Sequence, residues 1–233
     1  MYYGYGFDWT YILLLIGVVV SGIASMRVNS TFNKYARIAS SVGMTGAQAA
    51  QKILYSEGIT DVAIEHVAGN LTDHYNPSTK TVNLSDATYN STSVAAIGVA
   101  AHECGHVLQH HKGYVPLSIR TALVPVANVG SRAGIPIIII GMFLGANPTL
   151  INLGILVFSF GVAFQIVTLP VEFNASSRAL DLLGTLGILN PAEVKDTGKV
   201  LKAAAMTYVA SAFASVLSLM RLLILFGGNR RRD

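Results

Sequence analysis

The sequence predicts a mainly α integral membrane protein with about four transmembrane helices and a small α+β region outside the bilayer. Of the 233 residues, 52% are hydrophobic and only 12% are charged. A soluble domain carries about 25% charged residues, so this chain is short of the groups that keep a surface wet. Its apolar residues gather in four long stretches, and the segment between the first two has an ordinary soluble composition.

The first stretch predicts a transmembrane anchor within residues 1–26. Residues 11–24 are almost entirely apolar, which gives a span of about 15–18 residues, near the lower limit for crossing the hydrocarbon. No Lys or Arg precedes Arg27, whereas a cleaved signal peptide begins with positive charge. The span is therefore expected to be retained, with an interfacial belt of aromatic residues formed by Tyr2, Tyr3, Tyr5 and Trp9.

Residues 27–120 are predicted to fold outside the bilayer, beginning with a short helix. Thr45 and Gln48 have the spacing of a capping box, which predicts a helix that runs to about Ser56 and ends at Gly58.

Two strands and a second helix are expected to follow in the same region. Alternation of apolar and polar residues predicts strands at residues 62–67 and 81–85. Ser91 or Thr92 is then expected to cap a helix that ends near Gly113.

Three further apolar stretches complete the predicted membrane part. Residues 121–170 are expected to form two transmembrane or hairpin helices. The apolar stretch of the first is interrupted by Pro125, Arg132 and Pro136, and Pro170 is expected to end the second. Residues 171–202 form a polar segment whose helix would begin near Glu172. Residues 203–233 are expected to hold a last transmembrane helix and a basic tail.

The basic residues predict how the chain is oriented in the cell membrane. Eleven of the 16 Lys and Arg residues lie on the side that holds residues 27–120 and 171–202. The positive-inside rule therefore predicts a multi-pass protein with this side in the cytoplasm. The tail at 230–232 is an exception to the rule, unless residues 203–226 do not cross fully. No basic run alternates with aromatic residues, so nucleic acid is not an expected partner.

The segment His102-Glu-Cys-Gly-His106 carries the clearest chemical signal. Chance would place this pattern in a chain of this composition roughly 0.003 times. Two histidines four residues apart share one helix face and can hold one metal ion. Glu103 stands beside them, where its carboxylate can take a proton from a water. We expect one Zn²⁺, with Glu103 as the general base.

A catalytic zinc usually takes a third protein ligand. Two apolar stretches separate Glu172 from the histidines, which returns it to their side of the membrane and makes it the favoured candidate. Its alternative role is that of a glutamate in the first turn of a helix. Cys104 is turned away from the histidine face and is expected to pack as a small hydrophobic residue. The other candidate ligands are His66, His74, His110, His111, Glu57, Glu65 and Glu193.

Five short motifs follow one another along the chain. They are GMTG at 43–46, DHYNP at 73–77, VNLS at 82–85, AHECGH at 101–106 and TLPVEFNAS at 168–176. In this order they resemble the YugP-like bacterial membrane zinc metallopeptidases. The resemblance implies a neutral zinc endopeptidase of the zincin type, in which residues 27–120 are the catalytic region. It also implies that His102, His106 and Glu172 are the ligands and that Glu103 is the base.

One position departs from the family. The YugP-like proteins usually have aspartate where this chain has Asn174, two residues after the expected ligand. Asparagine can accept a hydrogen bond but supplies no charge, so the substitution bears on metal affinity.

Together these features predict a membrane-embedded zinc endopeptidase that hydrolyses peptide or protein substrates. The substrate is expected to pair with the strand at 81–85. A further donor to the oxyanion is expected from Arg178, His74, Tyr75 or Tyr208. The alternative is a non-enzymatic membrane scaffold or chaperone with a structural or degenerate metal site. A transporter is disfavoured because the chain lacks paired halves.

Overall fold

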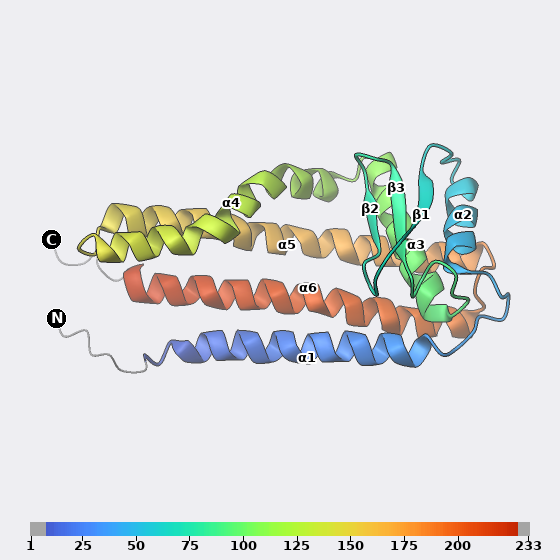
Figure 1. The fold of residues 1–233 in the computed structure, drawn as a ribbon, viewed down its shortest axis with the longest axis horizontal. Coiled ribbons are helices and arrows are strands. Elements are labelled where there is room, and N and C mark those ends of the chain that lie inside the picture. Colours follow the sequence, from blue (N-terminus) through green and yellow to red (C-terminus); the bar gives the residue numbers. More distant parts are fainter. Residues whose placement is uncertain (1–7, 228–233) are drawn as a thin grey trace. The chain divides into compact units, whose positions relative to one another are not determined.

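The computed structural model describes residues 8–227. Its elements are α1 (Tyr11–Tyr35), α2 (Gly46–Ser56), β1 (Ala63–Val67), β2 (His74–Asn76), β3 (Thr81–Ser85), α3 (Val94–His111), α4 (Val115–Phe143), α5 (Pro148–Thr185) and α6 (Pro191–Phe226) (Figure 1). They divide between two compact units. Unit 1 takes Met1–Ala24, Ile119–Thr168 and Thr207–Asp233, and unit 2 takes Ser25–Ser118 and Leu169–Met206. Tyr2, Tyr3, Tyr5 and the basic tail at 230–232 lie outside the described residues.

Four of the described helices, α1, α4, α5 and α6, are long and apolar enough to cross a membrane. Together with a small three-stranded sheet, they confirm the predicted mainly α membrane fold. The helix end expected at Pro170 was wrong, because α5 runs through this residue, as α4 runs through Pro125 and Pro136. Each proline removes one backbone hydrogen bond, but ending the helix would leave several polar groups unpaired, which is costly in an apolar environment.

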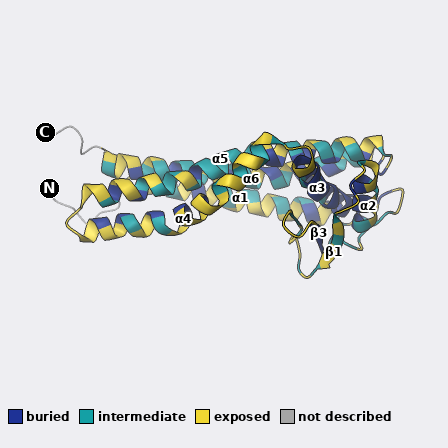
Figure 2. Ribbon diagram, turned by 90° about the horizontal axis from the view of Figure 1, so that it is seen from above, coloured by how far each residue is buried: buried dark blue, intermediate teal, exposed yellow. Residues whose placement is uncertain are grey.

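Unit 1 contains the most apolar parts of these helices. Small residues bring α4 and α5 together, since a Cβ on Gly134 would lie 3.0 Å from the Cα of Phe158. Ile138, Ile151 and Leu222 form its small buried cluster. Most other apolar side chains of the unit are partly or fully exposed, as is usual where lipid tails take the place of a protein core (Figure 2).

Unit 2 holds the sheet and the larger core. Strand β3 is central, parallel to β1 and antiparallel to β2, and all five of its residues are buried. Helix α3 packs against this sheet and against α2, and Figure 2 shows the buried residues concentrated on α3. The core is built from apolar side chains of these elements, among them Ile53, Leu84 and Ile97.

Most of the helix caps and strands predicted for unit 2 are confirmed. Thr45 and Gln48 form a reciprocal capping box at the start of α2, and Gly58 follows its end at φ +71°. The strands expected at 62–67 and 81–85 are β1 and β3. The expected cap of α3 was wrong by one or two residues, because Ser93 is the N-cap and its hydroxyl accepts the Ala96 N–H.

Strand β2 was not predicted. It has only three residues, which is too short for an alternating pattern to be recognised.

Candidate metal centre

The candidate site forms where α5 approaches α3 within unit 2. A Cβ on Gly105 would lie 2.5 Å from the carbonyl oxygen of Ala175, so only glycine at this position allows the two backbones to come so close. The approach brings the interior of α5, including Glu172, to the face of α3 that carries the two histidines. Glu172 therefore does not begin a helix, and its alternative role as a first-turn residue was wrong.

Three side chains converge at this point. The Nε2 atom of His102 lies 3.2 Å from Oε2 of Glu172, and the Nε2 atom of His106 lies 3.7 Å from the same oxygen. The three ligand atoms are all within 4.8 Å of one another, so one metal ion could be held between them. Glu172 is only 2% exposed, and a buried carboxylate of this kind needs a partner of opposite charge.

Two nearby carboxylates, those of Glu172 and Glu103, determine the direction in which the pKa of His106 is shifted. Burial alone would lower the pKa of His106, but the hydrogen bond to Glu172 and the nearby charge of Glu103 outweigh burial and raise it. The pocket therefore favours positive charge at the place where the ligand atoms meet.

Glu103 occupies a different position from the ligands. Its side chain is buried, and its Oε2 atom accepts the backbone N–H of Tyr75 at 2.9 Å. Tyr75 is the middle residue of β2, an edge strand whose only partner in the described sheet is β3. Glu103 therefore stands between the metal ligands on α3 and the free edge of the sheet.

The second ring nitrogens of both histidines also have partners. Nδ1 of His102 lies 3.1 Å from the hydroxyl of Ser176, and Nδ1 of His106 lies 3.0 Å from Oε1 of Gln109. Gln109 in turn donates to the carbonyl of Val171 and to the side chain of Asn174. Both Nε2 atoms are thereby turned toward Glu172.

Two imidazoles and one carboxylate are the donor set of many catalytic zinc sites. Here all three ligand side chains are buried or half-buried and lie on helices. Each histidine is oriented by a hydrogen bond to its other ring nitrogen, as in established zinc centres. The residues present therefore fit one zinc ion and leave its further position for a substrate or a water.

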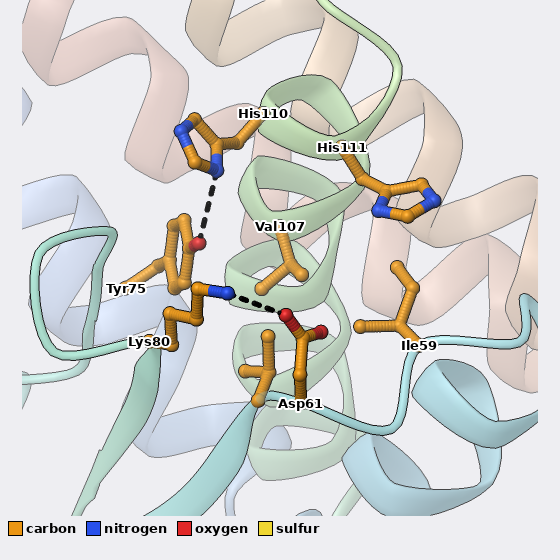
Figure 3. A pocket seen from close by; sticks show the side chains of 8 residues that line it. Ile59, Asp61, Tyr75, Lys80, Val107, His110 and His111 are labelled. Carbon is orange, nitrogen blue, oxygen red and sulfur yellow. Dashed lines mark hydrogen bonds and ion pairs between the residues drawn. The ribbon is translucent and has the colours of Figure 1, made fainter.

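Two of the other candidate ligands lie away from this group. His110 and His111 line a separate pocket of about 170 Å³ beside the last turns of α3 (Figure 3). Its polar groups pair with each other: Lys80 bonds Asp61 at 2.6 Å, and the hydroxyl of Tyr75 lies 3.3 Å from Nδ1 of His110. None of the three grouped ligands lines this pocket.

The expected oxyanion donors are placed in different surroundings. Arg178 donates through Nε to the side chain of Asn174 and lies 6.0 Å from the ring of Tyr114. His74 is exposed on β2, and its Nδ1 donates to the carbonyl of Thr72. Tyr208 belongs to unit 1. Their catalytic role stays a prediction.

Cys104 behaves as expected. Its side chain is fully buried, with Sγ 3.7 Å from the carbonyl oxygen of Ala50 in α2, and burial raises the pKa of its thiol. It packs into the core on the side of α3 that faces α2, so it is no ligand of this group.

The expectation about the substrate strand was wrong. Residues 81–85 form β3, which is paired on both sides and wholly buried, so it has no free edge to offer a peptide. The edge strands of the described sheet are β1 and β2, and it is β2 that lies beside the site, since Tyr75 contacts Glu103.

Sequence reasoning also missed Ser176 and Gln109 as partners of the histidines. Their positions carried a weak signal, since Ser176 is four residues after Glu172 and Gln109 is three after His106, on the same helix faces.

Comparison with known proteins agrees with this geometry. Residues 10–227 match the model of a family described as "putative neutral zinc metallopeptidase". The chain is also 43% identical over 218 residues to "Putative membrane protease YugP" of Bacillus subtilis (strain 168), covering 94% of this chain and 96% of that protein. No solved structure matches the chain.

Proposed function

The chain belongs to the family of "putative neutral zinc metallopeptidases", and on this premise we propose that it is a membrane-embedded zinc endopeptidase. One observation carries the proposal: His102, His106 and Glu172 bring their ligand atoms within 4.8 Å of one another. Two of them come from α3 and the third from α5, 66 or 70 residues further along the chain. Two imidazoles and one carboxylate are the protein ligands of a common class of catalytic zinc sites.

Glu103 is the proposed general base. When bound, zinc supplies a Lewis acid that polarises the scissile carbonyl and lowers the pKa of the attacking water to about 7. Glu103 takes the proton of that water and passes it to the leaving amine. The Tyr75 N–H holds one oxygen of the Glu103 carboxylate at 2.9 Å, which leaves the other oxygen for the water.

The free edge of β2 is the proposed binding site for the substrate backbone. An extended peptide would pair with the backbone groups of β2 that neither β3 nor Glu103 occupies, and it would lie beside Glu103, which accepts the Tyr75 N–H. Such main-chain pairing binds peptides without demanding a particular side chain, so the proposed substrates are extended or unfolded segments.

The oxyanion donor is proposed to be His74 or Arg178, which belong to the same unit as the metal group. His74 lies on the substrate edge, but its Nδ1 already donates to Thr72, so its Nε2 can donate only from the imidazolium form. The positive-inside rule supports the proposal that the site faces the cytoplasm.

The non-enzymatic alternative requires a closed metal site. A structural zinc usually has four protein ligands, whereas three side chains form the group among residues 8–227 and Cys104 is turned to α2. We therefore favour the peptidase over a scaffold.

Changing Glu103 to Gln tests the proposal. Gln keeps the size of the side chain but cannot take a proton, so zinc content should stay near one per chain while cleavage of fluorescent casein falls about 10²–10⁴-fold. Glu65→Gln, at an exposed glutamate of β1, is the matched control and should keep full activity. Unchanged turnover in Glu103→Gln would reject the mechanism, and a zinc-loaded wild type that cleaves nothing would favour the scaffold.

A further inference from the structure

Gln109 is a buried polar residue within the core of unit 2. Its side chain is 0% exposed, yet it stands on α3 among apolar neighbours. Burying an amide whose hydrogen bonds are not made is destabilising, so its presence calls for a reason. The chemistry of the proposed peptidase does not use it.

The hydrogen bonds around Gln109 determine which way its amide points. The nitrogen Nε2 lies 2.8 Å from the carbonyl oxygen of Val171 and 3.0 Å from Oδ1 of Asn174. A backbone carbonyl can only accept, so this end of the amide must be the donating NH₂ group. The other end, Oε1, is therefore the acceptor, and it faces Nδ1 of His106 at 3.0 Å.

Asn174 is oriented from the other direction. Its Oδ1 accepts from Nε of Arg178 at 2.8 Å, and a guanidinium is always a donor. The oxygen of Asn174 is thus directed to both Arg178 and Gln109. Arg178, Asn174 and Gln109 form one row of donors and acceptors that ends at His106.

We propose that Gln109 is a positioning residue that keeps His106 in the tautomer with its proton on Nδ1. An acceptor at Oε1 requires Nδ1–H, which leaves the lone pair of Nε2 directed to the metal position beside Glu172. Asn174 and Arg178 act on the histidine through Gln109, which bonds both Asn174 and His106. The inference rests on the proposed metal site and adds residues to it.

The row also bears on what an aspartate at 174 would change. An aspartate there would accept the same two hydrogen bonds and add a charge opposite Arg178. Asparagine supplies the acceptor without the charge. Residue 174 bonds Gln109 and not His106, so the exchange of aspartate for asparagine alters only a partner of Gln109. The tautomer of His106 is still set by Gln109.

Two substitutions at one position separate positioning from packing. Gln109→Met keeps the volume but removes the acceptor, and should weaken zinc affinity 10–100-fold. Gln109→Glu keeps an acceptor for His106 but loses the donation to Val171, and should hold zinc within about threefold of wild type. Both lose the bond to α5, so both should lower the midpoint of thermal unfolding of the metal-free protein. Gln51→Met, at an exposed glutamine of α2, is the control.

Zinc affinity is measured by competition with a chromophoric chelator on the purified full chain in detergent. Equal affinity in wild type and Gln109→Met, or equal losses in the Met and Glu variants, would overturn the inference. If the wild type itself binds no zinc, the proposed function fails instead, so the two failures are distinguishable.

The tautomer has its own readout, which does not depend on how well the variants fold. In ¹⁵N-histidine spectra of the zinc-loaded wild type, His106 should carry its proton on Nδ1. A proton on Nε2 would overturn the inference.

Discussion

The two parts of α5 have opposite patterns of burial. Before Leu169 the helix belongs to unit 1, and large apolar side chains such as Leu153, Leu156 and Ile166 are exposed. From Leu169 it belongs to unit 2, where Glu172 and Ser176 are among the buried residues.

The difference shows that one helix meets two kinds of environment. Exposed apolar side chains need a lipid phase, which the high mean hydropathy of the α5 window supports. Buried polar side chains need specific partners, and on α5 these come from α3. Substitutions in the second part should therefore affect the metal centre, and those in the first part should not.

The largest effect on the metal centre is expected at Gly105, the glycine that allows α5 to lie close to α3. In Gly105→Ala the new methyl group meets the carbonyl of Ala175, so the helices must separate by some tenths of an ångström. We expect a loss of about 1–3 kcal/mol in unfolding free energy and at least tenfold weaker zinc binding.

Gly22→Ala in α1 is the matched control for this change. A Cβ there has no neighbour within 4 Å, so stability should stay equal or rise by up to about 1 kcal/mol. Equal effects of the two substitutions would contradict the close approach of α5 to α3.

The second prediction concerns pH. Because the pKa of His106 is raised in the folded metal-free protein, its ion pair with Glu172 stabilises the fold fully below the unfolded pKa of about 6.5. That stability is lost as pH rises through the raised folded pKa. Zinc needs the neutral ring, so zinc affinity should change in the opposite sense and fall as pH drops through the same range.

Thermal unfolding of metal-free wild type and His106→Gln between about pH 5 and 9 tests this. The stability difference between them should shrink as pH rises, and a constant difference would show that His106 does not titrate in this way.

A smaller effect is expected at Ser176, whose hydroxyl lies beside Nδ1 of His102. Ser176→Ala removes one hydrogen bond from a ligand histidine and should weaken zinc about tenfold, the lower end of the range for such partners. Chelator competition measures this. Ser177→Ala, on the exposed face of the next position, should leave affinity unchanged.

The smallest effect is expected in the first part of α5. Leu156 is 55% exposed, so Leu156→Ala should change the free energy of unfolding by less than about 0.5 kcal/mol and should leave zinc affinity unchanged. Leu183→Ala makes the same change at a fully buried position in the second part and should cost about 2–5 kcal/mol. Similar costs for both leucines would show that the two parts of α5 do not differ in burial.

The sequence predicted what depends on local spacing or composition. His102 and His106 follow from the helix period, the capping box of α2 from its residue types, and the long apolar helices from hydropathy. Glu172 was reached by chain topology, although its helix was expected to begin there. In fact α5 continues through Pro170, because a proline removes one bond without forcing the helix to end.

What the sequence did not predict depends on contacts between distant segments. Tyr75 contacts Glu103 across 28 residues, and Gln109 contacts Asn174 across 65. No periodicity encodes such pairs, and β2 is too short to be seen as a strand. The edge available to a substrate was misplaced for the same reason, since strand order is a tertiary property.

Anomalous diffraction at the zinc absorption edge, from crystals of the zinc-loaded protein, would locate the proposed metal ion directly. We expect one peak per chain, bonded to Nε2 of His102, Nε2 of His106 and a carboxylate oxygen of Glu172, without a fourth protein side chain. A peak at another place, or a fourth protein ligand closing the site, would contradict it.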